Sequence, residues 1–261
     1  MMPVLASLSW VFLAAALLMS LLWLVQRRTG NAGVVDAGWA AGIGLAALGL
    51  GTFMEGEPGR RVLVALTGGL WGIRLAWHIH HRSHGKPEDG RYQQLRREWG
   101  DQVQFRMFRF YQLQAITVAF FALPFALAAR DVAPFGRWTD LAAALLWLIA
   151  LTGEAWADAQ LKSFKAAGPA AGPVCRVGLW KYSRHPNYFF EWLNWCAFAL
   201  LALLAPGGYL ALLAPAAMLF LLLRVTGIPA TEEQAVRSKG EAYRDYQRTT
   251  SAFIPWFPKK G

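Results

Sequence analysis

The residues best placed for chemistry lie where a basic, aromatic loop gives way to an apolar run. Asn187, Glu191 and Trp195 follow Pro186 at intervals of four residues, so a helix that starts near the proline carries all three on one face. A carboxylate at bilayer depth costs about 2.5–3.5 kcal/mol on insertion scales, and such residues are usually functional. The spacing therefore predicts a polar site, with Asn187 at or near the helix N-cap.

A second polar stripe leaves another apolar run at its carboxyl end. It consists of Glu154, Asp158, Lys162 and Lys165. These positions share one helical face, as they would in a ladder of ion pairs on a solvated helix end. Glu154, however, falls within the expected hydrocarbon region, where a ladder is costly. A structural ladder and a ligand-binding stripe both stay open at this point.

A third candidate is Asp36, about one turn into the apolar run Gly33–Phe53. It is either an interfacial acid that favours the helix dipole or an intramembrane anchor that faces the bundle interior. Nearby, Gly42-x-Gly44-x-x-Ala47 imitates a dinucleotide-binding fingerprint. It follows no strand, so we interpret it as a site of close helix packing.

The run that ends near residue 79 carries Arg74 and His78 on one face. Arg74 either extends its guanidinium to the membrane interface or contacts a ligand. Lys86, in the loop that follows, either pairs with phosphate charges or belongs to an ordinary basic loop. His80 and His84 have a spacing that suits a metal, but the chain has five histidines in all, and we predict no metal site.

The composition predicts an all-α integral membrane protein, because the chain is 56% hydrophobic and 16% charged and its charges cluster between long apolar runs. A net charge of +10 fits basic loops and anionic partners, and no basic-aromatic groove predicts nucleic-acid binding. The two cysteines make no disulfide framework. Seven apolar runs predict about seven spans: Val4–Val25, Gly33–Phe53, Val62–Ile79, Ala115–Ala129, Leu141–Ala157, Tyr188–Ala205 and Leu210–Val225.

The basic residues predict the orientation of the bundle. Of the 26 lysines and arginines, 20 fall in four segments that alternate spans place on one side, so we expect the N-terminus outside and the C-terminus inside. The segment Gln93–Tyr111 is polar and amphipathic, and we expect it to lie along the membrane surface as an interfacial helix. We expect one membrane-embedded domain, 1–261. The sequence predicts no particular oligomeric state.

The motif Gly178-Leu-Trp-x-Tyr-Ser-Arg-His-Pro-Asn-Tyr-Phe-x-Glu191 resembles the signature of bacterial membrane proteins grouped with the steroid 5-alpha-reductase family. The resemblance implies a multi-pass enzyme of the bacterial inner membrane that reduces an activated C=C bond with NADPH. Because the basic segments coincide with the distinctive motifs, we expect the active site to face the cytoplasm. Residues 1–111 would then form the substrate side and 112–261 the cofactor side. Phe190 stands where the family commonly has glycine.

The resemblance also implies roles for individual residues. Asn187 and Glu191 would contact the nicotinamide, Asp158 the ribose or amide region, and Lys165 a phosphate. The other candidate cofactor-binding residues are Arg74, Lys86, Arg184, Tyr188, Trp195, Tyr243, Tyr246 and Arg248.

For catalysis, Asp36 and Trp71 match positions where the steroid enzymes have a Glu and a Tyr that polarise the substrate carbonyl. An indole N–H donates a hydrogen bond but is no proton source as a phenol is. We therefore predict that Asp36, Trp71 and His78 form the catalytic group, with His78 or Asp36 providing the proton. The substrate would be a lipophilic molecule, a steroid-like enone or another lipid.

Two other function classes remain open. The Arg184-His185-Pro-x-Tyr188 motif also resembles isoprenylcysteine-type membrane methyltransferases, which use S-adenosylmethionine. A tail with Glu232-Glu233, Tyr243-x-x-Tyr246 and Ile254-Pro255 occurs in both groups. A non-enzymatic lipid-binding or transport protein would bind no nucleotide.

Overall fold

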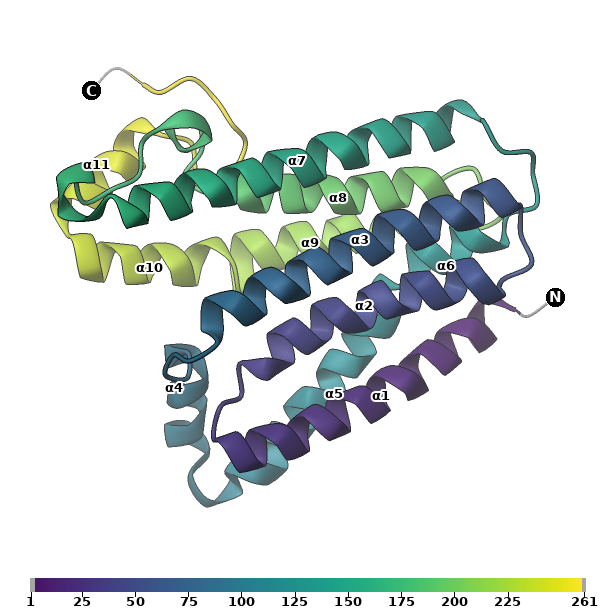
Figure 1. Cartoon of the computed structure of the whole chain (residues 1–261), viewed down its shortest axis with the longest axis horizontal. Helices are drawn as coiled ribbons and strands as arrows, with labels where there is room; N and C mark the ends of the chain where they lie inside the picture. Colours follow the sequence, from purple (N-terminus) through teal and green to yellow (C-terminus); the bar gives the residue numbers. More distant parts are fainter. Residues whose placement is uncertain (1–2, 260–261) are drawn as a thin grey trace. The chain divides into compact units, whose positions relative to one another are not determined.

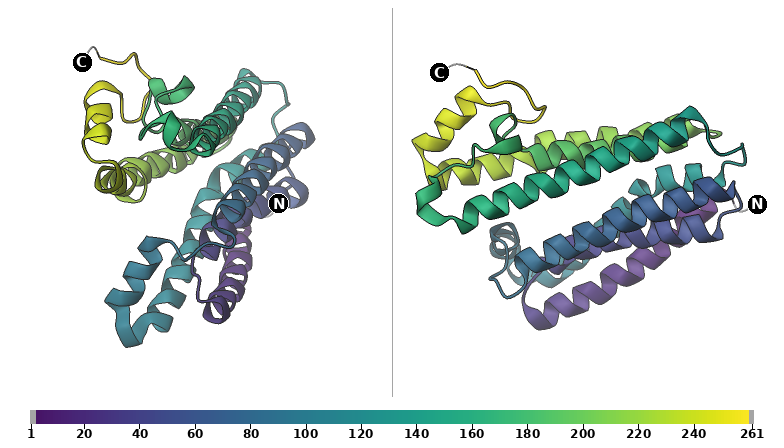
Figure 2. Two further views of the ribbon diagram at one scale, coloured as in Figure 1. Left: turned by 60° about the vertical axis from the view of Figure 1, so that its left-hand side comes forward. Right: turned by 45° about the horizontal axis from the view of Figure 1, so that its top comes forward.

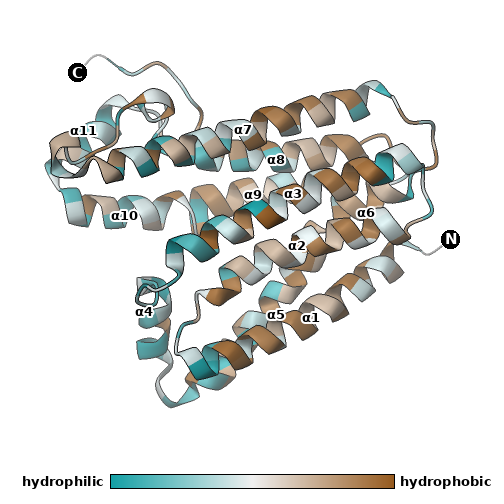
Figure 3. Ribbon diagram, in the orientation of Figure 1, coloured by the Kyte–Doolittle hydropathy of each residue, from teal (hydrophilic) through white to brown (hydrophobic). Residues whose placement is uncertain are grey.

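The computed structural model describes residues 3–259, and helices follow one another through this part of the chain without a strand (Figure 1). Six helical segments are long and apolar enough to cross a membrane: Val4–Thr29, Val34–Phe53, Pro58–Ser83, Gly90–Arg130, Trp138–Ala166 and Gly208–Lys239. Figure 3 shows the apolar residues concentrated along these helices and polar residues on the short helices α4 and α11. These features confirm the all-helical class and indicate a multi-pass integral membrane protein.

The seventh expected span, Tyr188–Ala205, corresponds to helix α8 (Pro186–Ala202), which has 17 residues and is shorter than the six others. The number of spans and the side that the N-terminus faces therefore stay predictions. Asn187 is the second residue of α8, because Pro186 occupies the first position, where its missing N–H costs nothing.

The chain divides into two compact units. The first contains the residues up to Asp140 together with Leu201–Ala211, and the second contains Leu141–Leu200 together with the residues from Leu212 onward. The boundary between them lies about one helix later in the chain than the predicted change from substrate side to cofactor side at residue 111. The prediction of a single functional domain over 1–261 stays a prediction.

The first unit is built from six α-helices. They are α1 (Val4–Thr29), α2 (Val34–Phe53), α3 (Pro58–Ser83), α4 (Gly90–Trp99), α5 (Val103–Phe121) and α6 (Leu123–Arg130), with a short 3-10 turn η1 (Gly100–Gln102) before α5. Helix α2 packs along α3, and α1 packs along α5. A Cβ added to Gly44 would lie 3.1 Å from the Cα of Gly72. The glycine pattern in α2 therefore serves close helix packing, as predicted.

The interfacial helix expected over Gln93–Tyr111 is wrong for its second half. Residues Phe105–Tyr111 belong to α5, which runs without a break into the next predicted span. Met107 and Tyr111 are completely buried, and the hydroxyl of Tyr111 donates a hydrogen bond of 2.9 Å to the carbonyl of Ala32. The many polar side chains in this stretch led to the interfacial prediction, although one face of the helix is apolar and packs against the rest of the first unit.

A buried ion-pair cluster closes the other end of the first unit. Arg60 at the start of α3 is completely buried and holds both carboxylate oxygens of Asp140, at 2.8 and 2.9 Å. Its guanidinium also lies 3.5 Å from Asp131. A planar guanidinium matches a carboxylate in this two-bond geometry. Arg60 is thus a structural residue.

The α2–α3 contact gives a stability prediction. A Cβ on Gly72 would lie 2.5 Å from the Cα of Gly44 and 2.8 Å from the carbonyl oxygen of Ala40, so Gly72→Ala should lower stability by about 1–3 kcal/mol. Gly49→Ala is the matched control, because nothing lies within 4 Å of its added Cβ and alanine favours the helix. Apparent melting temperatures in detergent compare the two, and equal values would show that the close approach is not a constraint.

The second unit holds α7 (Trp138–Ala166) from Leu141 on, α8 up to Leu200, α9 (Leu213–Phe220), α10 (Ile228–Lys239) and α11 (Glu241–Thr249). Its shorter turns are η2 (Gly168–Ala171), η3 (Gly178–Lys181) and the π-helical turn η5 (Leu221–Val225), whereas most of η4 (Gly208–Leu212) belongs to the first unit. Figure 2 shows α7 and α8 side by side in both views. The loop before α8, helix α11 and the last residues of the chain gather at the carboxyl end of α7, as their hydrogen bonds show.

Candidate functional site

Carboxylates on α7 face carboxamides on α8. The side-chain amide of Asn187 lies 3.3 Å from the carboxylate of Asp158, and that of Asn194 lies 3.4 Å from Glu154. Glu154 and Asn194 are buried, at 4% and 0% exposure. The polar stripe on α7 is therefore a set of contacts with α8, and it continues into the basic residues at the end of α7.

Glu191 lies on the same helix as these amides. The indole N–H of Trp195 donates a hydrogen bond of 2.9 Å to its carboxylate, so the two share one face of α8, as their spacing predicted. Trp195 is completely buried and Glu191 is 9% exposed. In the part of the chain that the structure describes, the side-chain amide oxygen (Oδ1) of Asn194 is buried without a hydrogen-bond donor. Asn187, Glu191 and Asn194 together give α8 a row of amide and acid groups.

The bulky side chain of Phe190 on α8 is accommodated by Gly153 on α7. A Cβ added to Gly153 would lie 2.4–2.6 Å from three ring carbons of Phe190, so the aromatic ring fills the space that a side chain on α7 would need. The bulky residue on α8 and the missing side chain on α7 complement each other. The departure from the family pattern at Phe190 therefore leaves the α7–α8 contact intact.

Basic residues follow the acid row toward the end of α7. Lys162 and Lys165 are exposed, and Lys165 lies close enough to Lys239 at the end of α10 for their charges to interact. The ammonium group of Lys239 lies 5.8 Å from the centre of the Tyr243 ring. Two lysines whose charges interact suit an anion such as a phosphate group.

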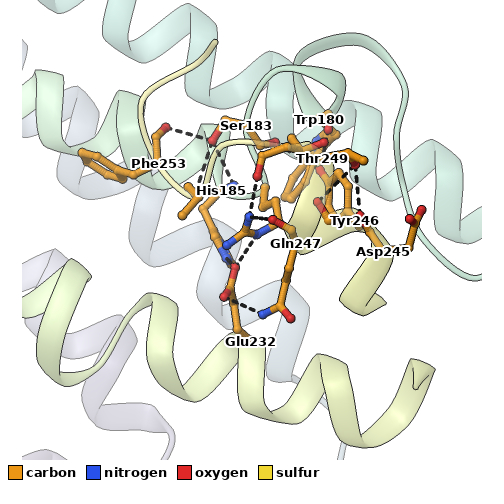
Figure 4. Close-up of polar contacts among 12 residues, drawn as sticks. Trp180, Ser183, His185, Glu232, Asp245, Tyr246, Gln247, Thr249 and Phe253 are labelled. Carbon is orange, nitrogen blue, oxygen red and sulfur yellow. Dashed lines mark hydrogen bonds and ion pairs between the residues drawn. The ribbon is translucent and has the colours of Figure 1, made fainter. Parts of the chain in front are cut away.

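Arg184, Glu232 and Gln247 form a nearly buried network between the loop before α8 and the helices α10 and α11. Figure 4 shows Glu232 and Gln247 pointing toward each other in this network. The Arg184 guanidinium donates to Glu232 at 2.6 Å and to the carbonyl of Gln247 at 3.0 Å, and it also contacts the carbonyl of Thr250. The side-chain amide of Gln247 donates to the second oxygen of Glu232 at 2.9 Å. Arg184 therefore ties the tail of the chain to the start of α8.

His185 and Tyr188 extend this network. A ring nitrogen of His185 lies 3.2 Å from Glu232, and its imidazole stacks on the Tyr188 ring at 5.3 Å between centres and 12° between planes. The Tyr188 hydroxyl lies 3.2 Å from that of Thr231. The Arg-His-Pro-x-Tyr motif thus folds onto α10 as one unit.

The tyrosines of α11 face the loop before α8. Tyr246 donates its hydroxyl to the carbonyl of Ser183 at 3.2 Å and also contacts that of Trp180. Burial raises the pKa of Tyr246 and of Tyr243, so both phenols stay protonated donors at neutral pH. Arg248 is instead on the surface, where it pairs with Glu241 at 2.8 Å.

In the first unit, Asp36 is held by helix α4. The Tyr92 hydroxyl donates a hydrogen bond of 2.7 Å to one carboxylate oxygen of Asp36, and the Arg91 guanidinium lies 3.2 Å from the other. Tyr92 is 3% exposed. Asp36 is thus part of an acid–phenol–guanidinium group, whichever of its two predicted roles applies.

The other candidates of the first unit lie on α3 and in the loop after it. Trp71 is completely buried, with its ring 6.3 Å from that of Trp39 in an edge-to-face contact. Arg74 and His78 are half-buried one turn apart, and Lys86 is exposed. Within residues 3–259, no group of three potential metal ligands comes together.

Asn194, Glu232 and Tyr92 take part in these groups although they were not among the predicted site residues. Asn194 lies seven residues after Asn187 and three after Glu191, on the same face of α8, so helical periodicity alone points to it. Glu232 belongs to the Glu-Glu pair of the tail. Tyr92 follows the Glu-Asp-Gly-Arg run after α3, and no sequence signal connects it with Asp36, 56 positions earlier.

Two curated relatives resemble part of the chain. The 3-oxo-5-alpha-steroid 4-dehydrogenase 1 of Mus musculus is 26% identical over 111 residues, which cover 42% of this chain and 40% of the relative. The protein of the same name from Rattus norvegicus is 25% identical over 111 residues, 42% of this chain and 39% of the relative. The chain thus matches about two fifths of the length of these relatives. No solved structure matches it.

A longer match covers residues 22–250, and its family is described as "Protein of unknown function (DUF1295)". This family is steroid 5-alpha-reductase-like. The chain therefore belongs to the DUF1295 family.

Proposed function

We propose that the protein is a membrane reductase that uses NADPH to reduce an activated C=C bond in a lipophilic substrate, a steroid-like enone or another lipid. One observation carries the proposal: helices α7 and α8, which are otherwise apolar, hold a row of acids and amides, with Glu154, Asp158 and Glu191 opposite or beside Asn187 and Asn194. Such groups at membrane depth are costly and usually functional. The family and the names of the two relatives support the same chemistry.

The donors and acceptors of the second unit fit a dinucleotide. Nicotinamide and ribose present amide N–H, carbonyl and hydroxyl groups, which the carboxamides of Asn187 and Asn194 and the carboxylates of Glu191 and Asp158 can bind. The buried oxygen of Asn194 needs a donor, and a ligand amide or hydroxyl would supply one. Lys165 beside Lys239 suits a phosphate group. Bound NADPH would supply the hydride.

In the first unit, we assign Asp36, His78 and Trp71 to the substrate. Reduction adds a hydride to the β-carbon of the enone and a proton to the α-carbon, and a hydrogen-bond donor at the carbonyl oxygen stabilises the enolate that develops between these steps. The indole N–H of Trp71 is such a donor. The proton must come from a group that can release one.

Tyr92 supplies the phenol that is missing at position 71, where this chain has a tryptophan. Its hydroxyl is 2.7 Å from Asp36, so phenol and carboxylate can share a proton, while the nearby Arg91 favours negative charge on this pair. We therefore extend the catalytic group to Tyr92, with Asp36 as the group that passes the proton on. His78 remains the alternative source.

The placement of charge supports an active site on the cytoplasmic side, where NADPH is available. In the first unit, the hydrogen bonds of Asp36 with Tyr92 and of Ala32 with Glu88 bring the basic segment after α3 to the start of α2. In the second unit, the basic loop before α8 and the tail form one network. Basic loops of a membrane protein favour the cytoplasm, and we propose the bacterial inner membrane as its location.

The experiment that tests the proposal measures equilibrium binding of NADPH and of S-adenosylmethionine to the purified protein in detergent. We expect NADPH to bind and S-adenosylmethionine not to bind. A protein that binds S-adenosylmethionine instead would be a methyltransferase. A protein that binds neither would contradict an enzyme of either class.

The role of Tyr92 gives a second test. We expect Tyr92→Phe to lower kcat about tenfold, less than the full 10²–10⁴ that a positioned acid supplies, because Asp36 remains. The KM for NADPH should not change. Tyr111→Phe is the control, since its hydroxyl binds only the Ala32 carbonyl among the contacts described. Steady-state oxidation of NADPH, followed as a function of pH, measures both, and an unchanged kcat and pH profile in Tyr92→Phe would remove it from the proton path.

A further inference from the structure

The last described residues of the chain form a C-terminal strap, residues 250–259, that is fixed at four points. The amide of Arg184 donates to the carbonyl of Ser251 at 2.8 Å, and the Ser183 hydroxyl donates to that of Phe253 at 2.8 Å. The amide of Trp256 donates to the Tyr182 carbonyl at 2.9 Å, and that of Lys259 to the Thr249 carbonyl at 2.9 Å. The strap therefore has a defined path along the loop before α8.

The side chains of the strap divide into an inner and an outer set. Phe253 is buried and packs edge-to-face on Phe189 and Trp192, at 5.7 and 5.9 Å between ring centres. Ile254, Trp256 and Phe257 form the outer set, with 60%, 70% and 76% of their surfaces exposed. In water such exposure costs about 25 cal/mol for each Å² of apolar surface.

The position of the strap indicates what covers this outer patch of Ile254, Trp256 and Phe257. Phe189 and Trp192, on which Phe253 packs, lie in the first two turns of the apolar helix α8. The loop before α8 is bonded to the spanning helix α7 through the Trp180 indole and the Ala157 carbonyl, at 2.9 Å. The strap that carries the patch is therefore held against the segment between α7 and α8, beside the first turns of α8.

Charge and aromatic character agree with a lipid surface. Lys181 and Lys259 are exposed beside the patch, and the Lys181 ammonium lies 5.9 Å from the centre of the Tyr182 ring. The Tyr182 ring in turn contacts Phe257 at 6.0 Å. An open hollow of about 400 Å³ lies between the end of α11 and the strap, with Trp256 and Lys259 in its lining. Tryptophan and tyrosine beside lysine are typical of the membrane interface.

We propose that the outer patch inserts into the interfacial layer of the bilayer and that Lys181 and Lys259 contact the phosphates of anionic lipids. The strap would then anchor the loop before α8 to the membrane surface. The proposal concerns how this end of the second unit meets lipid, and it does not depend on the proposed reaction.

The test uses spin labels in the full-length chain, with both natural cysteines changed to alanine. One label replaces Phe257, a second replaces Arg244, which is exposed on the polar helix α11, and a third replaces Leu145, which is 61% exposed on α7. The protein is reconstituted in nanodiscs of phosphatidylcholine with one quarter phosphatidylglycerol. Collision rates of each label with oxygen, which concentrates in lipid, and with a water-soluble nickel complex report its surroundings.

We expect the label at position 257 to resemble that at 145, with a ratio of oxygen to nickel collisions several times that at 244. A ratio equal to that at 244 would overturn the proposal, since the patch would then face water. Low collision rates with both reagents would also overturn it, because a protein partner would then cover the patch.

A second arm tests the lysines. Changing Lys181 and Lys259 to glutamine should move the label at position 257 toward water in anionic nanodiscs, by about fivefold in partitioning for each lysine, and should have no effect in neutral ones. An equal effect in both membranes would contradict contact with anionic lipid. If the cysteine-free chain does not fold, the quenching of tryptophan fluorescence by brominated lipid in the parent chain answers the same question. We then expect brominated lipid to quench the part of the fluorescence that comes from Trp256, which is the part that is missing in Trp256→Phe.

Discussion

The substitution Glu191→Gln is expected to weaken NADPH binding by about 10–100-fold while the protein remains folded. A hydrogen bond to a charged group is worth about 1.5–3 kcal/mol, and glutamine removes the charge without changing the shape. The Trp195 indole, at 2.9 Å from the Glu191 carboxylate, can still donate to the glutamine oxygen. The fold therefore keeps its contact, and the ligand loses an ionised partner.

The measurement is a titration of NADPH fluorescence with purified protein in detergent, with the melting temperature recorded on the same samples. Glu233→Gln is the matched control, because Glu233 is 64% exposed on α10 and pairs with Arg237 one turn away. Its affinity for NADPH should equal that of the parent. An unchanged dissociation constant in Glu191→Gln would remove Glu191 from the cofactor site, and a large loss of stability would assign it to the fold.

The substitution Arg184→Met is expected to lower stability by about 3–5 kcal/mol, since it leaves the partly buried Glu232 without its cation. Three backbone or side-chain partners lose a donor: Glu232, the Gln247 carbonyl and the Thr250 carbonyl. For a chain of this size, the melting temperature should fall by roughly 6–20 °C. Arg237→Met removes an exposed pair with Glu233, and there we expect a loss of about 1 kcal/mol at most.

The same variant separates two roles for Arg184. Sequence motifs made it a candidate for cofactor binding, whereas in the structure its guanidinium holds the tail. Arg184→Lys keeps a charge but not the planar fork, and it should fall between the parent and Arg184→Met in stability. If Arg184→Met melts at the parental temperature but binds NADPH poorly, Arg184 contacts the cofactor and the tail is held by other bonds.

Much of the architecture follows from the amino-acid sequence alone. Apolar runs as long as a bilayer is thick must form helices, because only a helix bonds its own backbone groups within hydrocarbon. Helical periodicity then places Glu191 beside Trp195 and aligns Glu154 with Asp158. Pro186 marks the start of α8 for a local reason, the fixed φ and missing N–H of proline.

Contacts between segments far apart in the chain could not be predicted from the sequence. The bond between Tyr92 and Asp36 spans 56 positions, and that between Arg184 and Glu232 spans 48. Asp36 and Arg184 stood out in the sequence, but their partners Tyr92 and Glu232 were not predicted site residues, because a polar residue in a loop or on a helix surface is ordinary until a neighbour gives it a role. The same holds for Phe190, whose ring needs the missing side chain of Gly153, 37 positions earlier.

The sequence by itself thus determined the helical membrane class, the faces of α7 and α8 and the motifs of the family, since these depend on hydropathy and on periods of three to four residues. Only the tertiary structure decided which acid meets which amide, phenol or guanidinium. Those pairings depend on how helices far apart in the chain pack against one another, and packing is set by the shapes of many side chains at once.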